Sequence, residues 1–146
     1  MSARGGAALY TPEILALAVE LAGYPLSSDL DLQGEAHSRV CGSRVAVGLA
    51  RAPDGEIARI GARVSACAIG QAAAALFLRS AAGRNGAEIA EGLAALDGWL
   101  AGGGELPDWP GIAQLASARP YSTRHSAILL PWKAALAALS NPARAD

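Results

Sequence analysis

The chain has 146 residues, a length that suits one compact domain and is too short for two of ordinary size. Apolar residues make up 52% of it and charged residues 17%, so the chain can bury a sizeable core. Its 12 basic and 13 acidic residues leave a net charge of −1, which gives no reason to expect binding to nucleic acid or to a membrane surface.

Cysteine usage and hydropathy also argue against a disulfide-stapled secreted fold and a membrane span. Only two cysteines are present, and residues 1–10 lack the charged-then-apolar pattern of a secretory signal. No apolar run reaches the roughly 18 residues that a membrane-spanning helix needs. We expect a cytoplasmic protein with reduced thiols. It would have a flexible segment at 1–9, one domain at 10–140 and a short tail at 141–146.

The first predicted element is a helix that starts after Thr11 and ends at Gly23. Thr11 is a typical N-cap residue, and Pro12 suits the first position of a helix. Residues 24–35 are polar and rich in turn formers, which predicts a loop. The segment "EAHSRV", residues 35–40, fits a short edge strand.

Residues 43–66 are predicted to form a β-hairpin. Apolar side chains alternate with others from Arg44 onward, as expected for a strand. Pro53 and Gly55 mark the turn, because proline presets φ and glycine accepts a positive φ. The alternation is imperfect around Gly61, which predicts a β-bulge there.

From Ala68 onward the apolar spacing becomes helical. The predicted helices cover residues 68–83, 86–101, 111–117 and 125–140. Pro131 falls in the first two turns of the last one, where we expect it to kink the helix without ending it. Because the strands are grouped before most of the helices, the pattern predicts an α+β domain. It would be a small antiparallel three-stranded sheet with helices packed on one face.

The two cysteines both lie at junctions between predicted elements. Cys41 precedes Gly42 just before the first hairpin strand, and Cys67 follows the second strand. At a helix N-terminus, unpaired N–H groups and the helix dipole favour the thiolate of Cys67. Isolated cysteines are nevertheless often buried small hydrophobes, and no CxxC pair argues otherwise. The residues alone leave both interpretations open.

The two histidines also lie at junctions. His37 is four residues before Cys41, and in a strand an even spacing places both side chains on one side of the chain. His125 begins the last predicted helix, with Ser126 beside it. Two cysteines and a histidine are a donor set that suits zinc or ferrous iron.

The stretch "VCGSRVAVGLARAPDGEIARIGARVSACAIGQAAAALF" resembles the core of the U-type iron–sulfur cluster scaffolds, the family of IscU, SufU and the N-terminal part of NifU. That family has a cysteine in a Cys-Gly-Asp motif, a β-hairpin, a second cysteine opening an alanine- and serine-rich helix, and a third heading the last long helix. "TPEILALAVELAGYP" is similar to its N-terminal helix, so the resemblance covers residues 10–139. It implies a non-enzymatic scaffold or carrier for iron, zinc or an iron–sulfur cluster. The implied partners are a cysteine desulfurase and other assembly proteins, with the chain a monomer or a weak homodimer.

The resemblance is incomplete at the ligand positions. Cys41 matches the first cysteine and Cys67 the second, but Ser43 stands in place of the aspartate. Ser126 stands in place of the third cysteine, and His125 matches the residue before it. The chaperone-recognition motif of the IscU branch is absent from "ARPYSTRHS", and the segment between the second cysteine and the histidine resembles the SufU-type insertion.

Three functions therefore stay open. The first is a scaffold that holds iron, zinc or a cluster through Cys41, Cys67 and His125, with Ser126 in the cofactor-binding set and His37 as a further metal ligand. The second is a module that docks on a cysteine desulfurase without holding metal, because two of four family ligands are missing. The third is sulfur acceptance, in which Cys67 takes a persulfide sulfur and passes it on.

Overall fold

The computed structural model describes residues 9–140. The predicted tails therefore lie outside the described residues at 1–8 and 141–146. Leu9, the last residue of the predicted flexible segment, is described, and it is buried in the core with 3% of its surface exposed.

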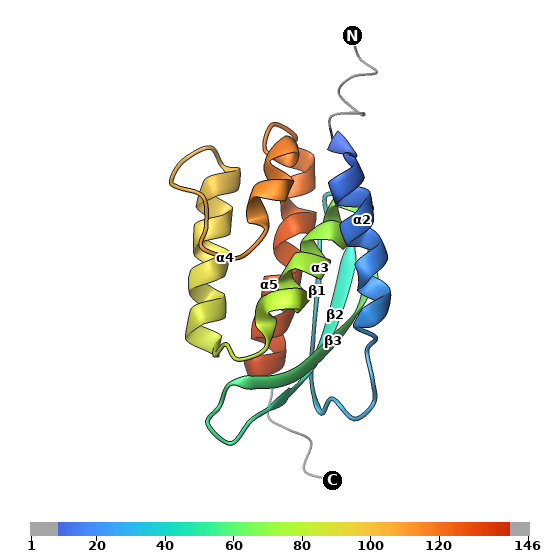
Figure 1. Ribbon diagram of the computed structural model, residues 1–146, viewed down its shortest axis with the longest axis vertical. Helices are drawn as coiled ribbons and strands as arrows, with labels where there is room; N and C mark the ends of the chain where they lie inside the picture. Colours follow the sequence, from blue (N-terminus) through green and yellow to red (C-terminus); the bar gives the residue numbers. More distant parts are fainter. Residues whose placement is uncertain (1–8, 141–146) are drawn as a thin grey trace.

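The chain folds as an α+β domain with its elements in nearly the predicted order (Figure 1). The elements are α2 (Pro12–Glu20), η1 (Leu21–Gly23), β1 (Leu32–His37), β2 (Arg44–Arg51), β3 (Ile57–Ser65), α3 (Ala68–Ala81), α4 (Gly86–Leu100), η2 (Ile112–Ala118) and α5 (Ser122–Ser140). The helices η1 and η2 are 3-10 helices.

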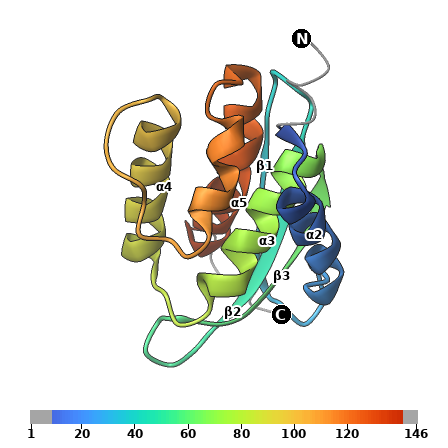
Figure 2. The ribbon, with the colours of Figure 1, turned by 45° about the horizontal axis from the view of Figure 1, so that its top comes forward.

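The three strands form one antiparallel sheet, as predicted, and its strand order is β1-β2-β3. Val47 of β2 lies opposite Gly34 of β1 and Ala62 of β3. The side chains of Val45, Val47 and Leu49 are buried at alternate positions of β2. Helix α5 packs on β1 and β2 and α3 packs on β3 and α5, so these two helices cover one sheet face (Figures 1 and 2).

The contact between β1 and α5 is unusually close because it is made at a glycine. A Cβ atom on Gly34 would lie 2.2 Å from the backbone nitrogen of Ala138 and 2.5 Å from the carbonyl oxygen of Ala134. Any other residue would push the helix away from the sheet. Gly34 therefore sets the position of α5.

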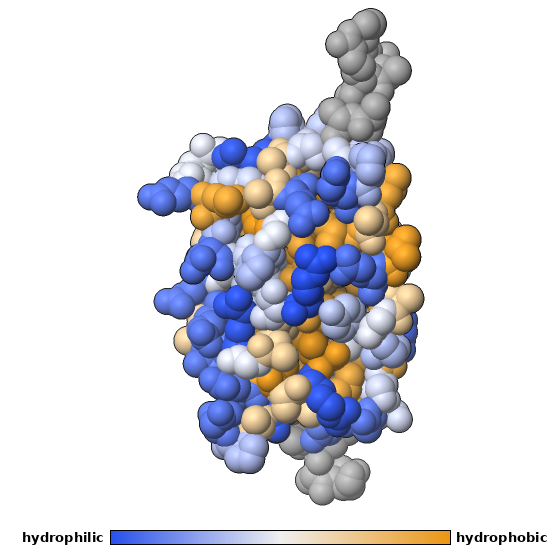
Figure 3. All heavy atoms as spheres, in the orientation of Figure 1, coloured by the Kyte–Doolittle hydropathy of each residue, from blue (hydrophilic) through white to orange (hydrophobic). Residues whose placement is uncertain are grey.

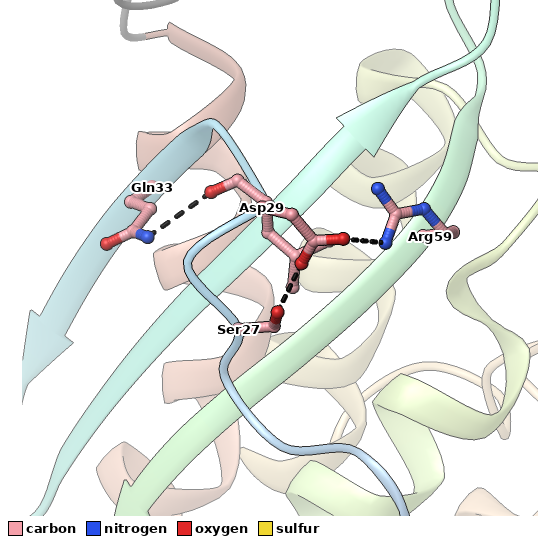
Figure 4. A network of polar contacts seen from close by, with 5 residues as sticks. Ser27, Asp29, Gln33 and Arg59 are labelled. Carbon is pink, nitrogen blue, oxygen red and sulfur yellow. Dashed lines mark hydrogen bonds and ion pairs between the residues drawn. The ribbon is translucent and has the colours of Figure 1, made fainter.

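The loop between η1 and β1 covers part of the other sheet face. Pro25 forms an isolated bridge with Ala62 of β3. Further along the loop, Asp29 accepts hydrogen bonds from Ser27 and from Arg59 of β3, and its ion pair with Arg59 measures 2.7 Å (Figure 4). These contacts fix the loop against the sheet.

Two strand details differ from the prediction. β1 begins at Leu32, so its first residues lie where a loop was predicted. The irregularity of the hairpin lies at Ala50 and Arg51, whereas Gly61 pairs in register with Gly48. A Cβ on Gly61 would lie 2.1 Å from the carbonyl oxygen of Pro25, so this glycine serves close packing instead of a bulge.

The last helix begins earlier than predicted. Its first residue is Ser122, which places His125 inside the first turn and Pro131 at the tenth position. The helix nevertheless continues through the proline, as predicted. The earlier start changes which side chains of α5 face the end of the sheet.

Exposed apolar side chains occur in separate places on the surface. Leu15 and Val19 are one turn apart on α2, where apolar atoms gather along the right-hand edge in Figure 3. Val40, next to Cys41 in the turn between β1 and β2, is 69% exposed. Among residues 9–140, no helix has both the length and the apolar character needed to cross a bilayer.

Candidate functional site

Three distant segments of the chain meet at one end of the sheet. They are the turn between β1 and β2, the start of α3 and the start of α5 (Figures 1 and 2). The ladder between β2 and β3 ends with Arg44 paired to Ser65. This last pair lies three residues after Cys41 and two residues before Cys67. The hairpin therefore brings the turn that carries Cys41 to the start of α3.

The turn that presents Cys41 is held by its own backbone. The N–H of Ser38 donates to the carbonyl oxygen of Ser43, and the N–H of Gly42 donates to the carbonyl oxygen of Ser38, both at 2.9 Å. Gly42 has a φ of +74°, in the left-handed region that favours glycine. Cys41 is thus exposed on a turn of defined shape.

Serine hydroxyls surround the Cys41 thiol. The Cys41 Sγ lies 3.0 Å from the Oγ of Ser43, and the Oγ of Ser38 lies 2.6 Å from the Oγ of Ser126. Burial opposes ionisation of the thiol, but hydrogen bonds to Ser43, Ser38 and Ser126 outweigh it. The pKa of Cys41 is therefore lowered. The hydroxyls thus stabilise the thiolate, the nucleophilic form of cysteine.

The two cysteines share a pocket of about 260 Å³. Its lining consists of Cys41, Gly42, Ser43, Ser65, Ala66, Cys67 and Arg124. Arg124 is the one charged side chain among these lining residues, and its Nη2 donates to the hydroxyl of Tyr10 at 3.4 Å. The pocket therefore combines two thiols with a cation and suits small anions such as a thiolate, a persulfide or sulfide.

Cys67 occupies the N-cap position of the 14-residue helix α3, as its place in the sequence predicted. Its side chain makes no capping hydrogen bond to the helix, and it is half-buried where Cys41 is exposed. The Cys67 thiol is therefore not engaged in capping.

Neither histidine joins the two thiols. His125 forms a hydrogen bond of 2.8 Å between its Nε2 and the carbonyl oxygen of Arg119. Because a carbonyl can only accept, Nε2 donates, and the neutral ring keeps its lone pair on Nδ1. His125 does not line the pocket that the two thiols share. His37 is exposed at the end of β1. The strand stops there, so the alternation expected to carry His37 to the side of Cys41 is interrupted by the turn.

Comparison with known proteins gives no match to a family model and none to a curated protein. Solved structures do match. The N-terminal part of a nitrogen-fixing NifU-like protein from Brucella abortus superposes with a TM-score of 0.80 and 27% identity, covering 88% of this chain and 90% of that one. The chain has the U-type scaffold fold.

Two further structures share this fold at lower identity. A candidate iron–sulfur cluster assembly scaffold protein for the SUF system of Fervidobacterium islandicum AW-1 has a TM-score of 0.80 and 20% identity, over 90% of this chain and 97% of that one. A hypothetical protein has a TM-score of 0.67 and 18% identity, over 88% and 97%. The U-type fold predicted from the cysteine motifs and the hairpin is confirmed.

The residues of this U-type site fit a metal ion or a cluster poorly. Within residues 9–140, no group of three or more histidine, cysteine, aspartate and glutamate side chains is placed to hold a metal ion. Ser43 and Ser126 stand where the resemblance expects two of the ligands, and both hydroxyls are in hydrogen bonds. The positive charge of Arg124 also opposes a cation in the pocket.

Two residues of the site are not marked by the sequence. Arg124 is one of three polar residues before the more conspicuous His125, and Ser38 is one serine among many. Only the packing of α5 on the sheet brings both to the thiols. For Arg124, the one available signal was a positively charged residue beside the start of the last predicted helix.

Proposed function

We propose that this protein takes part in iron–sulfur cluster assembly as a sulfur carrier built on the U-type scaffold fold. Its Cys41 would accept sulfur, as a persulfide, from a cysteine desulfurase. The observation that carries the proposal is one pocket. The exposed Cys41 thiol lines it with Arg124, and serines stand where the U-type resemblance expects metal-binding side chains. The likeness to a candidate scaffold of the SUF system supports the same process.

The transfer step requires an accessible thiolate. The Cys41 thiolate attacks the terminal sulfur of the persulfide on the donor enzyme, and a new S–S bond forms at Cys41. The S–S bond of the donor breaks, and the donor cysteine leaves as a thiolate. The Ser43 hydroxyl stabilises the negative charge on Cys41 before the transfer, and Arg124 gives the pocket that receives the persulfide a positive charge.

The exposure of the two thiols indicates which cysteine accepts the sulfur. The sequence favours Cys67, because a helix N-terminus promotes the thiolate. Cys41, however, is exposed on the turn, while Cys67 is half-buried at the start of α3. We therefore assign sulfur acceptance to Cys41. Because both thiols must stay reduced, the proposal also places the protein in a reducing compartment such as the cytoplasm.

Intact mass spectrometry tests the proposal. The Cys67→Ser variant, which keeps one thiol, is incubated with a cysteine desulfurase and cysteine. We expect its mass to rise by one sulfur atom, while the matched Cys41→Ser variant gains none. Sulfur found on Cys67 but not on Cys41 would contradict the assignment. Binding to the desulfurase without any sulfur gain would instead support the docking module.

A further inference from the structure

We propose that Cys67 releases the carried sulfur as sulfide by forming a disulfide with Cys41. In this step Cys67 attacks the Cys41 sulfur of the persulfide and expels HS⁻. The inference rests on the proposed function, because it starts from the Cys41 persulfide. It gives the second cysteine a chemical role in a pocket that does not suit a cluster.

The strand register brings the two cysteines to the same end of the sheet. The ladder between β2 and β3 ends with Arg44 paired to Ser65, three residues after Cys41 and two residues before Cys67. Both side chains line the same pocket, so the two sulfur atoms face a common space.

The surroundings of Cys67 leave its sulfur available. The residue sits at the N-cap of α3, but its side chain makes no capping hydrogen bond. The same side chain lines the pocket together with the exposed Cys41 thiol and Arg124.

The release of sulfide itself needs no outside reductant. The Cys67 thiolate forms a bond to the Cys41 sulfur, and the bond from that sulfur to the terminal sulfur breaks. The electron pair of the broken bond leaves with the terminal sulfur as HS⁻, so the terminal sulfur is reduced and the Cys67 sulfur is oxidised. A Cys67 that starts as a thiol gives its proton to solvent. Arg124 stabilises the leaving anion. A dithiol reductant then returns the disulfide to two thiols before the next cycle.

The competing reaction has a different product. If Cys67 attacked the terminal sulfur, the persulfide would move to Cys67 and no sulfide would appear. The release of sulfide, together with loss of two hydrogens from the chain, therefore identifies the proposed step.

The test uses sodium tetrasulfide as the sulfur donor, so that no partner enzyme is needed. Wild type, Cys67→Ser and Cys67→Ala are loaded with limiting tetrasulfide and freed of excess by gel filtration. Released sulfide is measured by the methylene blue reaction, and the chain is weighed without reductant. We expect wild type to release sulfide equimolar with its persulfide and to lose the mass of two hydrogens. Both Cys67 variants should keep the sulfur and lose sulfide release.

Controls distinguish a failure of sulfide release by Cys67 from a failure of sulfur acceptance by Cys41. Ser28→Ala changes an exposed serine in the loop between η1 and β1, outside the pocket lining, and should release sulfide as wild type does. Sulfide release from both Cys67 variants at the wild-type rate, or a loaded wild type that forms no disulfide, would overturn the inference and leave the proposed function standing. If Cys41 took up no sulfur from either tetrasulfide or desulfurase, the proposed function itself would fail.

Discussion

Ser43 and Ser126 decide what the thiol pocket can hold. Each stands where the U-type resemblance expects a metal-binding side chain, and each hydroxyl is a hydrogen-bond partner instead. Ser43 lies 3.0 Å from the Cys41 sulfur, and Ser126 lies 2.6 Å from the Ser38 hydroxyl. A neutral serine hydroxyl is a weak ligand for zinc or iron, whereas it stabilises a nearby thiolate well. Under the proposed function, these two short side chains favour sulfur over a metal cation in the pocket.

Restoring these two side chains should restore metal binding. The double variant Ser43→Asp/Ser126→Cys presents three thiols and a carboxylate, a set that suits tetrahedral zinc. We expect it to bind about one zinc ion per chain, and wild type to retain much less. The measurement is elemental analysis after purification without chelator and after gel filtration.

The single variants serve as controls for this prediction. Ser43→Asp and Ser126→Cys each supply one further ligand, so each should retain less zinc than the double variant. Equal zinc content in wild type and the double variant would show that the serines do not limit metal binding.

At the scale of single elements, the start of α5 determines which of its side chains reach the thiols. Successive residues of an α-helix project about 100° apart, so His125 and Ser126 cannot both face the same point. Ser126 contacts Ser38, and His125 turns back to the carbonyl of Arg119. The sequence predicts a helix here but not its rotation, because the rotation comes from packing on the sheet. The two thiols were easier to predict, since they follow from the ends of the hairpin strands.

Other elements were predictable where local signals are strong. Thr11 accepts from the N–H of Ile14 at the start of α2, and Asn85 forms a capping box with Glu88 at the start of α4. β1 lacks such signals, because the residues facing α5 are small and those between them are polar. Its start at Leu32 depends on contacts with the rest of the fold that no local pattern contains.

The close approach of β1 to α5 makes a prediction about stability. Gly34→Ala would place a methyl group within 2.2 Å of the backbone of α5, which can move only if the helix moves. We expect a loss of about 3 kcal/mol in the free energy of unfolding, measured by urea denaturation.

Gly98→Ala is the matched control for this change. Gly98 is exposed within α4, and a Cβ there meets nothing within 4 Å. Alanine is the better helix former by about 1 kcal/mol, so this variant should be more stable than wild type. A Gly34→Ala protein as stable as wild type would contradict the close packing of sheet and helix.

At the scale of the whole molecule, the reactive thiol lies beside an exposed apolar side chain. Val40 is 69% exposed on the same turn as Cys41. Under the proposed function, a desulfurase approaches this turn to deliver sulfur, and an apolar side chain buried on contact would strengthen that encounter.

We therefore expect Val40→Ser to slow sulfur transfer from the desulfurase about tenfold or more, which corresponds to a contact of about 1.4 kcal/mol. Loading by tetrasulfide should stay unchanged, because a small donor needs no docking surface and the substitution adds no charge. Leu106→Ser alters another exposed apolar residue, at 52% exposure and away from the pocket lining, and should leave both rates as in wild type. Equal slowing by both variants would argue against a local contact at the turn.

The bridge between Pro25 and Ala62 has a consequence for self-association. The outer edge of β3 would otherwise offer free N–H and carbonyl groups to the strand of another molecule, a route to aggregation. Here the N–H of Ala62 donates to the carbonyl oxygen of Tyr24 at 2.9 Å, and Pro25 has no N–H with which to extend the ladder. The loop thus occupies this edge at Ala62 with the chain's own backbone. At this point of β3, the strand of a second copy cannot pair with the sheet.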